Sequence, residues 1–345
     1  MEGKERGMND RIREWWTAFK ESPFLPASVL VVILAAGAGL FAGSYTYAMA
    51  APTPHRVPVA VVGVSYETVR GKAFVAGMEQ ALNTSLALSF PGSFERAREE
   101  AEEQRVFGVF TVHGNDVTLH VSSASGASVA QLLSAAAPKV APKVGMRLTV
   151  QDMKPLQRGD PRGLAIFYIT LAAVVIGFIG GTQLNVNAPG LRPGARIAFM
   201  AAYAMLGALS IVAIVDWLLG ALRLPFLESW FILALTMITT GLVYTMFHAL
   251  IGRWAMLPTW GLMVLLGNPS SGGAVSWPLL PSPLGAIGRW LPPGASVNAQ
   301  HTAVYFGGHQ SLTPFLVLAV WALGSCAVFL IRQGRGPLTG RESPS

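Results

Sequence analysis

Two ionisable side chains lie inside long apolar runs of the sequence. Asp216 interrupts the run 197–222, and His248 lies near the end of the run 230–252. Because a charge is costly among lipid tails, ionisable groups inside membrane helices commonly line substrate paths or proton relays. Asp216 could instead reach headgroup water or Arg223 from the outer end of its run, and His248 could serve a helix end or the membrane interface. We retain both as candidates for translocation or gating.

The stretch 253–308 holds the other gating candidates. It opens with the apolar run 254–266, which would form about 20 Å of helix, against the roughly 30 Å of a bilayer core. Beyond it the chain stays apolar but is broken repeatedly by proline and glycine, and Arg289 is the only charge before His301. Internal prolines remove backbone donors, so no single helix can cover this stretch. We predict a short membrane helix and then re-entrant or interfacial half-helices over 267–308, packed on protein or lining a wet cavity.

Broken segments of this kind lie where transporters handle their substrates. Pro281 and Pro292 interrupt the tract, and Trp277 lies among its first prolines. We therefore name these three residues as candidates for translocation or gating. Trp277 fits an interfacial anchor as readily as a substrate wall.

The sequence lacks the common catalytic motifs. No phosphate-binding GxxxxGK[ST] loop, HExxH, GxSxG or CxxC pair occurs in it. We therefore expect neither an enzyme nor a cofactor, and any ATP that drives the protein must be bound by another chain. His113 and His120 have no further ligands of suitable type near them, which predicts a surface role and not a metal site. Cys326 is the single cysteine, so no internal disulfide can form.

The composition is that of an integral membrane protein. Of the 345 residues, 52% are hydrophobic and 12% are charged, whereas soluble proteins average about 25% charged residues. Lysine and arginine outnumber aspartate and glutamate by 25 to 18, but eleven of the basic residues lie in short segments beside apolar runs. The basic excess therefore reports membrane topology, and we expect a lipid bilayer and no nucleic acid as partner.

The apolar runs predict an α-helical polytopic membrane protein with six transmembrane helices and an extracytoplasmic α/β domain between helices 1 and 2. The six helices are expected at 26–49, 164–186, 197–222, 230–252, 254–266 and 313–331. The parts in order are a cytoplasmic amphipathic segment 1–25, transmembrane helix 26–50, the α/β domain 51–163, a five-helix membrane domain 164–331 that includes the tract 267–308, and a cytoplasmic tail 332–345.

The first fifty residues leave two alternatives open. Ile12, Trp15, Trp16 and Phe19 share one helical face, which predicts an amphipathic helix in the inner interface, the alternative being a frayed basic tail. Ala48-Met49-Ala50 matches a small-x-small cleavage site, so residues 1–50 could instead be a signal peptide.

Residues 51–162 show the alternating and helical spacings of a compact α/β domain. The hairpin turning on Gly114-Asn115 is expected to pair Val112 with Val117, Phe110 with Leu119 and Gly108 with Val121. Its strands are predicted at 57–62, 86–90, 106–113, 117–122 and 147–151. Its helices are predicted at 65–83, 94–104 and 127–137, and the last is expected to end at Pro138.

The distribution of lysine and arginine sets the predicted orientation. With the amino terminus inside, short inner segments hold eleven basic residues, whereas the short outer loops hold only Arg223 and Arg289. Short cytoplasmic segments are enriched in positive charge. We therefore expect a multi-pass protein of the cell membrane with both termini in the cytoplasm, and with the α/β domain and the tract 267–308 on the outer side.

Three stretches carry a resemblance to a known family. They are Val57-Pro58-Val59-Ala60-Val61-Val62, then Ser122-Ser123-Ala124-Ser125-Gly126-Ala127-Ser128, and then Gly267-Asn268-Pro269-Ser270-Ser271-Gly272-Gly273 with Leu280-Pro281, Leu291-Pro292-Pro293-Gly294 and Tyr305-Phe306-Gly307-Gly308. They resemble segments of ABC-2-type export permeases, and within them of the membrane proteins related to phage-infection protein and to nitrosoguanidine resistance. The third stretch is the most specific, and in topology the resemblance covers nearly the whole chain.

The resemblance implies six helices per subunit, two subunits around a translocation path and a separate ATP-binding subunit in the cytoplasm. The segment 11–20 is similar to the family's elbow helix. The loop 187–196 departs from the family, because it is brief and interrupted by prolines where a coupling helix is usual. The expected ATPase-contact face consists of basic and aromatic residues of the inner segments: Arg11, Trp15, Trp16, Arg192 and Arg196.

Two functions remain from this sequence. The first is a permease subunit that exports an amphipathic or lipid-like compound, with the α/β domain and the broken tract shaping the exit. The second is a non-transporting membrane scaffold or receptor whose outer domain binds an envelope or extracellular partner.

Overall fold

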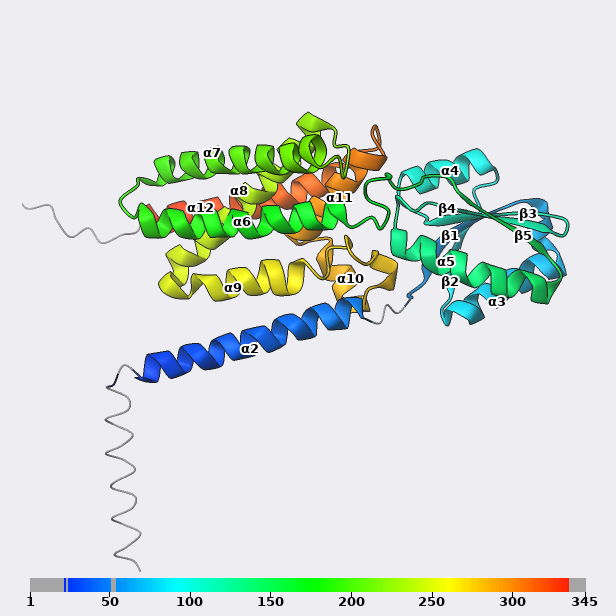
Figure 1. Ribbon diagram of the computed structural model, residues 1–345, viewed down its shortest axis with the longest axis horizontal. Coiled ribbons are helices and arrows are strands. Elements are labelled where there is room, and N and C mark those ends of the chain that lie inside the picture. The colour runs from blue at the N-terminus through cyan, green and yellow to red at the C-terminus, as the bar shows by residue number, and fades with distance from the viewer. Residues whose placement is uncertain (1–21, 23, 51–53, 335–345) are drawn as a thin grey trace, which may run out of the picture. The chain divides into compact units, whose positions relative to one another are not determined.

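The computed structural model describes residues 22, 24–50 and 54–334 (Figure 1). The chain separates into two units, residues 1–47 and 48–345. Helix α2 (Phe24–Met49) has 26 residues and no charge, and the rings of Phe41 and Tyr45 lie 4.4 Å apart on it. It begins two residues before the predicted helix and ends at the predicted residue. The predicted amphipathic helix, with Arg11, Trp15 and Trp16, lies outside the described residues.

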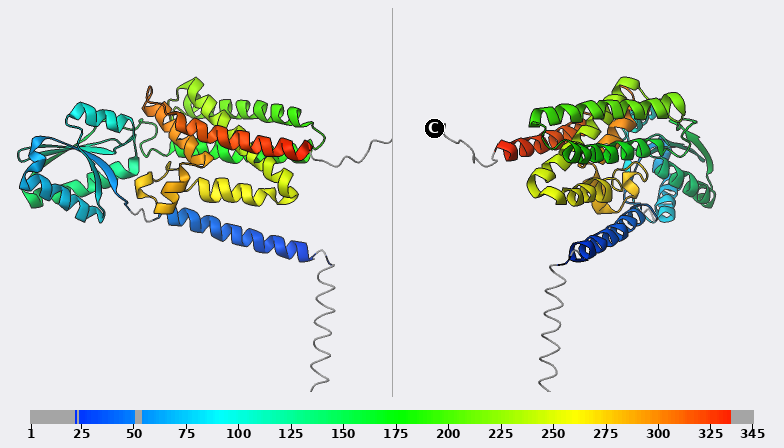
Figure 2. Two further views of the ribbon diagram at one scale, coloured as in Figure 1. Left: turned by 180° about the vertical axis from the view of Figure 1, so that it is seen from behind. Right: turned by 60° about the vertical axis from the view of Figure 1, so that its left-hand side comes forward.

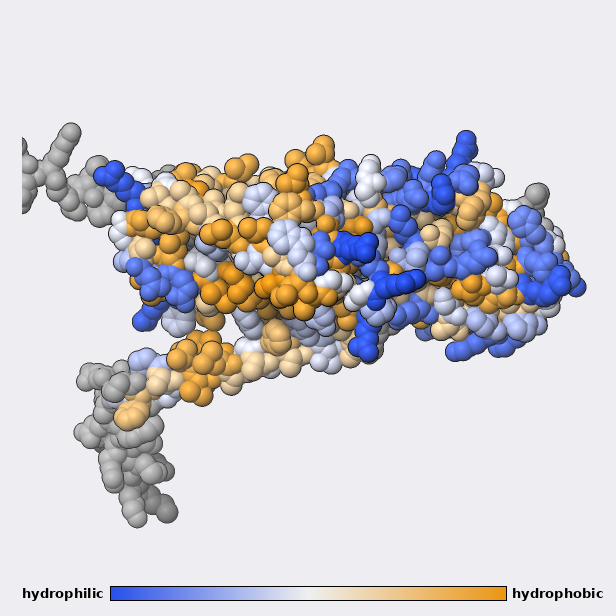
Figure 3. Space-filling view, turned by 45° about the horizontal axis from the view of Figure 1, so that its top comes forward, coloured by the Kyte–Doolittle hydropathy of each residue, from blue (hydrophilic) through white to orange (hydrophobic). Residues whose placement is uncertain are grey.

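Five helical stretches among the described residues are long and apolar enough to cross a membrane. They are Phe24–Met49, Ala165–Asn187, Pro193–Leu218, Phe226–Gly267 and Leu312–Gly334. Figure 3 shows apolar side chains covering much of one side of the helical region of residues 165–334, whereas polar side chains gather over the region of the sheet. These helices indicate a membrane protein built mainly from helices, together with a small mixed sheet.

The long helices follow the predicted runs closely, with one exception. Helices α6 (Ala165–Asn187), α8 (Phe226–Ile251) and α12 (Leu312–Gly334) differ from the prediction by at most four residues at either end. Helix α7 (Pro193–Val212) continues as a wider π-helix, Ala213–Leu218, and ends there, although the sequence predicted helix to residue 222. The helix ends because Gly220 adopts a left-handed conformation, with φ of 58°, and beyond this turn the carboxylate of Asp216 accepts a hydrogen bond from the Leu224 amide at 3.1 Å.

The predicted short helix 254–266 follows directly from α8. The chain turns through a 3₁₀ stretch, Gly252–Ala255, and returns as α9 (Met256–Trp260) and a π-helical stretch, Gly261–Gly267. Helix α9 packs back against α8. Residues 226–267 therefore contain two helical limbs, although their combined length and hydropathy qualify them as one candidate span.

Helix α8 carries four buried threonines that bond to their own helix. Thr236, Thr239, Thr240 and Thr245 each donate to the carbonyl four residues earlier, at 2.7 to 3.1 Å. Hydroxyl groups paired in this way carry no unmet hydrogen-bonding demand into an apolar interior. The Thr236 hydroxyl also lies 2.7 Å from the Ser296 hydroxyl, which links α8 to the broken tract.

The α/β domain is built on a five-stranded sheet in the order β2-β1-β3-β4-β5. Strand β1 pairs in parallel with β2 and β3, β4 is antiparallel to β3, and β5 is parallel to β4. The hairpin register is the predicted one, with Val112 opposite Val117, Phe110 opposite Leu119 and Gly108 opposite Val121. The strands are β1 (Val57–Val62), β2 (Leu86–Ser89), β3 (Gly108–His113), β4 (Asp116–Val121) and β5 (Arg147–Asp152).

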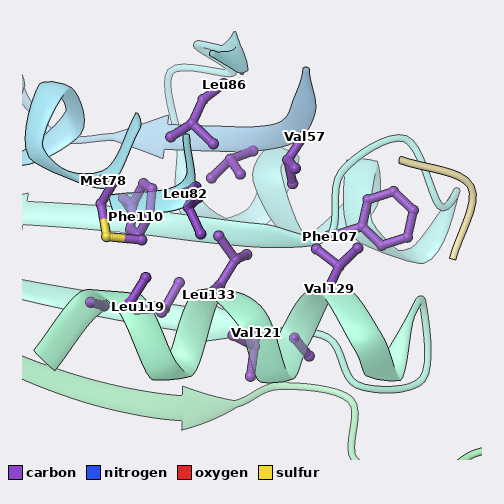
Figure 4. Packing of buried hydrophobic residues seen from close by; sticks show 14 of the residues in the cluster. Val57, Met78, Leu82, Leu86, Phe107, Phe110, Leu119, Val121, Val129 and Leu133 are labelled. Carbon is purple, nitrogen blue, oxygen red and sulfur yellow. The ribbon is translucent and has the colours of Figure 1, made fainter. Parts of the chain in front are cut away.

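Helices cover both faces of this sheet. On one face α3 (Val69–Leu82) and α5 (Ala127–Val140) pack on the hairpin, so that Phe110 and Leu119 lie among Met78, Leu82 and Leu133 (Figure 4). On the other face, α4 (Phe94–Glu102) buries Ala97 and Ala101 against β1 and β3.

Two predicted helix bounds in the domain were wrong. Helix α5 passes through Pro138 and ends at Val140, because one proline in the last turn removes one donor while Val140 is buried in the core. The helix predicted at 65–83 is split, because the Thr68 hydroxyl accepts a hydrogen bond from the Gly71 amide at 3.2 Å and starts α3 there.

Candidate functional site: a polar junction beneath the sheet

The tract 267–308 forms two short helices with prolines at their starts. Pro281 precedes α10 (Ser282–Gly288), and Pro292 is the first residue of α11 (Pro292–Tyr305). Proline suits a helix start, because the first amides of a helix have no partner within it. At Gly288 a side chain is impossible, since a Cβ there would lie 1.8 Å from the Ser270 carbonyl oxygen. The prolines thus shape the tract, and the glycine lets its limbs touch.

One side of the tract is bonded to the long helices. The Ser296 hydroxyl lies 2.7 Å from that of Thr236 in α8, and the Gln300 side chain donates to the Ser229 carbonyl at 2.9 Å. Helix α11 also contacts α12, beside which it lies (Figures 1 and 2). Most of α11 is therefore packed on protein, whereas Ile287, Arg289 and Trp290 before it are exposed.

The other side of the tract is bonded to the α/β domain. The Ser128 hydroxyl lies 2.9 Å from the Ser276 hydroxyl and accepts from the Ser276 amide at 3.0 Å. The His55 amide donates to the Pro278 carbonyl at 2.7 Å. Two stretches that the sequence analysis singled out thus meet here, because Ser128 ends the stretch 122–128 and bonds to the tract, and His55, two residues before β1, bonds to the tract as well.

Two small cavities lie at this junction. The larger has a volume of about 40 Å³ and the smaller about 20 Å³, which together would hold a few water molecules. Both are lined by Ser125, Gly272, Ser276 and His301. The larger is also lined by Gln104, Phe107, Trp277, Val297 and Asn298, and the smaller by further residues that include Ser123, Ser128 and Arg162.

Two contacts fix the geometry of the junction. His301 donates from Nδ1 to the Ala124 carbonyl at 3.2 Å, and the side chain of Gln104 donates to the Thr302 hydroxyl at 2.8 Å. Gly126 leaves room for this closure, because a Cβ there would lie 2.5 Å from the Ser276 hydroxyl and 2.7 Å from the Phe107 ring. The α/β domain and α11 are therefore joined through side chains of both.

The junction is electrostatically quiet. Desolvation lowers the pKa of His301, which lies in α11 outside the five long apolar helices, to about 4, so the imidazole is neutral at physiological pH. Among the described residues, no carboxylate lines either cavity. Arg162, which lines the smaller cavity, is the one charged side chain in the two linings at physiological pH. Such a lining can hydrogen-bond a neutral polar group or water. Among the described residues no cluster of three potential metal ligands occurs.

The sequence candidates are distributed unevenly around this junction. Trp277 lines the larger cavity, and Pro281 lies four residues beyond it. Asp216 lies away from it, in the π-helical end of α7, where it holds the Leu224 amide. His248 lies near the far end of α8, with its ring 5.9 Å from that of Tyr244. About 33 Å of helix separates the start of α8 from His248, so Asp216 and His248 do not share a site.

The two arginines of the loop 187–196 differ. Arg192 is exposed, whereas Arg196 is only 6% exposed and its guanidinium donates to the Asn185 side chain and to the Pro189 carbonyl. Arg196 therefore closes the turn between α6 and α7 and does not present its charge outward. Of the predicted ATPase-contact residues in the described part of the chain, Arg192 alone is placed to meet another protein.

The sequence analysis did not name the polar residues of the junction. Ser276, Asn298 and His301 line its cavities but were not named as candidates. Their signal was present, since the two stretches that meet here are both rich in serine and glycine, and polar residues inside an otherwise apolar tract require partners. No family model, no curated protein and no solved structure matches this chain, so the site is interpreted from its own geometry.

Proposed function

We propose that this protein is the membrane subunit of an ABC-2-type exporter that moves an amphipathic or lipid-like compound outward, driven by a separate ATP-binding chain. In this proposal six helices cross the cell membrane, residues 254–267 forming the fifth. Both termini are cytoplasmic, the α/β domain is extracytoplasmic, and two copies flank the path. The helical membrane character of the chain and its resemblance to such permeases support the proposal.

The observation that carries the proposal is the double attachment of the tract 267–308. Ser296 and Gln300 bond to α8, while Ser276 and His301 bond to the α/β domain. A domain that merely hung from the membrane would need no such connection. Here any rearrangement of α8 changes the position of α11, and α11 is joined to the outer domain. This connection suits a gate at the outer end of a translocation path.

Co-purification tests the proposal. The protein is extracted in a mild detergent from its native membrane, and the nucleotide-binding chain is sought in the purified complex by mass spectrometry. We expect one such chain, and we expect Arg192→Ala to reduce its recovery, whereas an exposed arginine of the outer connection, Arg223→Ala, serves as the matched control. Recovery of the membrane subunit without any nucleotide-binding chain would contradict the exporter.

Labelling tests the proposed topology. In a Cys326→Ser background, Val69→Cys in the α/β domain should react with a membrane-impermeant maleimide on intact cells, because Val69 is 86% exposed. Trp290→Cys should react poorly although Trp290 is 65% exposed, because lipid would cover it. Rapid labelling at both positions would place the tract in water and remove the basis for a membrane gate.

A receptor or scaffold is the second candidate function. Its support is an exposed apolar patch on the α/β domain, where Phe90 is 58% exposed and lies 5.1 Å from Tyr66, ring to ring. Patches of this kind mark protein contacts. If Phe90→Ser abolishes binding of an envelope protein to the full chain and leaves export intact, the patch serves a separate partner. If export is absent altogether, the receptor becomes the main function.

A further inference from the structure

Arg289 is a cation that has no carboxylate partner among the described residues. It follows α10 directly, its side chain is exposed, and none of the ion pairs between described residues includes it. Its guanidinium carbon lies 5.1 Å from the centre of the Trp277 ring, which holds the cation against an aromatic face. The charge is therefore positioned but not neutralised.

A cation without a carboxylate partner is unusual at the depth along the membrane helices at which Arg289 lies. The carbonyl of the next residue, Trp290, accepts a hydrogen bond from the indole of Trp321 at 2.9 Å. Trp321 lies nine residues into α12, which has 23 residues, so the contact is about 14 Å from the start of a helix about 35 Å long. Arg289 thus lies alongside a membrane-length helix and not beyond its end.

The surroundings of Arg289 are apolar. Ile287 is 43% exposed and Trp290 is 65% exposed, on either side of the arginine. A long cationic side chain within lipid turns its head toward the nearer polar surface. The stacking on Trp277 indicates the direction, because Trp277 packs against the core of the α/β domain. The guanidinium therefore points toward the outer side while its backbone stays at the depth of the acyl chains.

We infer that Arg289, stacked on Trp277, binds the phosphate of an anionic phospholipid in the outer leaflet. A guanidinium presents two parallel donors that match two phosphate oxygens, and the lipid tails would cover Ile287 and Trp290. The inference rests on the proposed insertion of the tract into the membrane, and it does not require export. It assigns to this chain a lipid site that adjoins the larger cavity through Trp277, although Arg289 itself lines neither cavity of the junction.

Lipid retention tests the site directly. The full chain is reconstituted in nanodiscs of phosphatidylcholine with a minor fraction of phosphatidylglycerol and re-extracted, and the lipids that stay bound are measured by mass spectrometry. We expect the wild type to retain phosphatidylglycerol selectively and Arg289→Gln to retain about fivefold to tenfold less. Arg289→Lys should fall between them, because it keeps the charge and loses the fork. Arg223→Gln, an exposed arginine outside the long helices, is the matched control.

Three outcomes would overturn the site. Equal retention by the wild type and Arg289→Gln would show that Arg289 binds no lipid, and equal loss in Arg223→Gln would reduce the effect to net charge. Displacement of the lipid by inorganic phosphate would show a site for a soluble anion. If Arg289→Gln does not fold, fluorescence quenching in the wild type still tests the lipid site. Brominated phosphatidylglycerol must then quench tryptophan fluorescence more than brominated phosphatidylcholine does, and Trp290→Phe must reduce that difference. Absence of an ATP-binding partner would leave each of these results unchanged, so the site and the exporter fail separately.

Discussion

The hydroxyl oxygens of Ser128 and Ser276 lie 2.9 Å apart although 148 residues separate them in the chain. Ser128 also accepts the Ser276 amide at 3.0 Å. Removing the Ser128 hydroxyl therefore leaves a backbone donor without its partner, whereas removing the Ser276 hydroxyl leaves that donor bonded. The contact is asymmetric, and stability measurements can detect the asymmetry.

Ser128→Ala should lower the free energy of unfolding by about 1 to 2 kcal/mol, and Ser276→Ala by less than about 1 kcal/mol. The double variant should cost less than the sum, because both lose one shared contact. Thermal or denaturant unfolding in detergent measures all three, with Ser85→Ala on the exposed surface as control. Strict additivity would show that the two hydroxyls do not interact.

Gly126→Ala should weaken the contact between the α/β domain and the tract 267–308. Its new Cβ would lie 2.5 Å from the Ser276 hydroxyl and 2.7 Å from the Phe107 ring, so one of them must move. Overpacking of this kind costs about 1 to 3 kcal/mol, and it should also raise proteolysis near residue 276. Gly190→Ala, where the new methyl group meets nothing within 4 Å, is the control. Wild-type stability of Gly126→Ala would contradict the tight closure.

His301 should make the protein less stable in acid. Its pKa is lowered from 6.5 to about 4 in the folded chain, so the unfolded chain binds a proton first as the pH falls. Stability is then lost between about pH 6.5 and pH 4, by up to about 3 kcal/mol, and stays constant in this respect at lower pH. In His301→Gln the unfolding temperature should depend less on pH across this range than in the wild type. His113→Gln, on the exposed hairpin end, should keep the wild-type pH dependence. An unchanged slope in His301→Gln would show that another group dominates.

Asp216 should tolerate asparagine but not alanine. The side chain accepts from the Leu224 amide at 3.1 Å, and an asparagine oxygen can do the same. Asp216→Ala should therefore cost about 1 kcal/mol of unfolding free energy, while Asp216→Asn should keep both stability and export. Loss of export in Asp216→Asn with normal folding would restore the carboxylate as a translocation residue.

Substitutions of Arg196 and Arg192 should have different effects, the first lowering stability and the second lowering partner binding. Arg196→Ala leaves the Asn185 side chain and the Pro189 carbonyl without their donor, and it should cost about 2 kcal/mol. Arg192→Ala should change stability by less than about 0.5 kcal/mol, since the side chain is exposed. Unfolding of the purified variants checks both values, and an equal loss in the two would contradict the different roles of these arginines.

The elements with a clear repeat could be predicted from sequence. The hairpin register follows from alternation on either side of Gly114, and α6, α8 and α12 follow from uninterrupted apolar runs. The serine- and glycine-rich stretches of the junction are visible in the sequence, but their pairing could not be predicted, because hydrogen bonds such as Ser128 with Ser276 and Ala124 with His301 leave no periodic trace in the chain. The predicted end of α7 was wrong because Gly220, in a left-handed conformation, and the bond from the Leu224 amide to Asp216 turn the chain inside an apolar run.

The threonines of α8 bear on what this helix needs from its neighbours. Thr236, Thr239, Thr240 and Thr245 bond to carbonyls of their own helix, so the hydroxyls are satisfied as soon as the helix has formed. Because the lipid interior offers such groups no other partner, these hydroxyls do not require α11 in order to be buried in an apolar environment. Of the four, Thr236 is the one that also contacts α11, through the Ser296 hydroxyl.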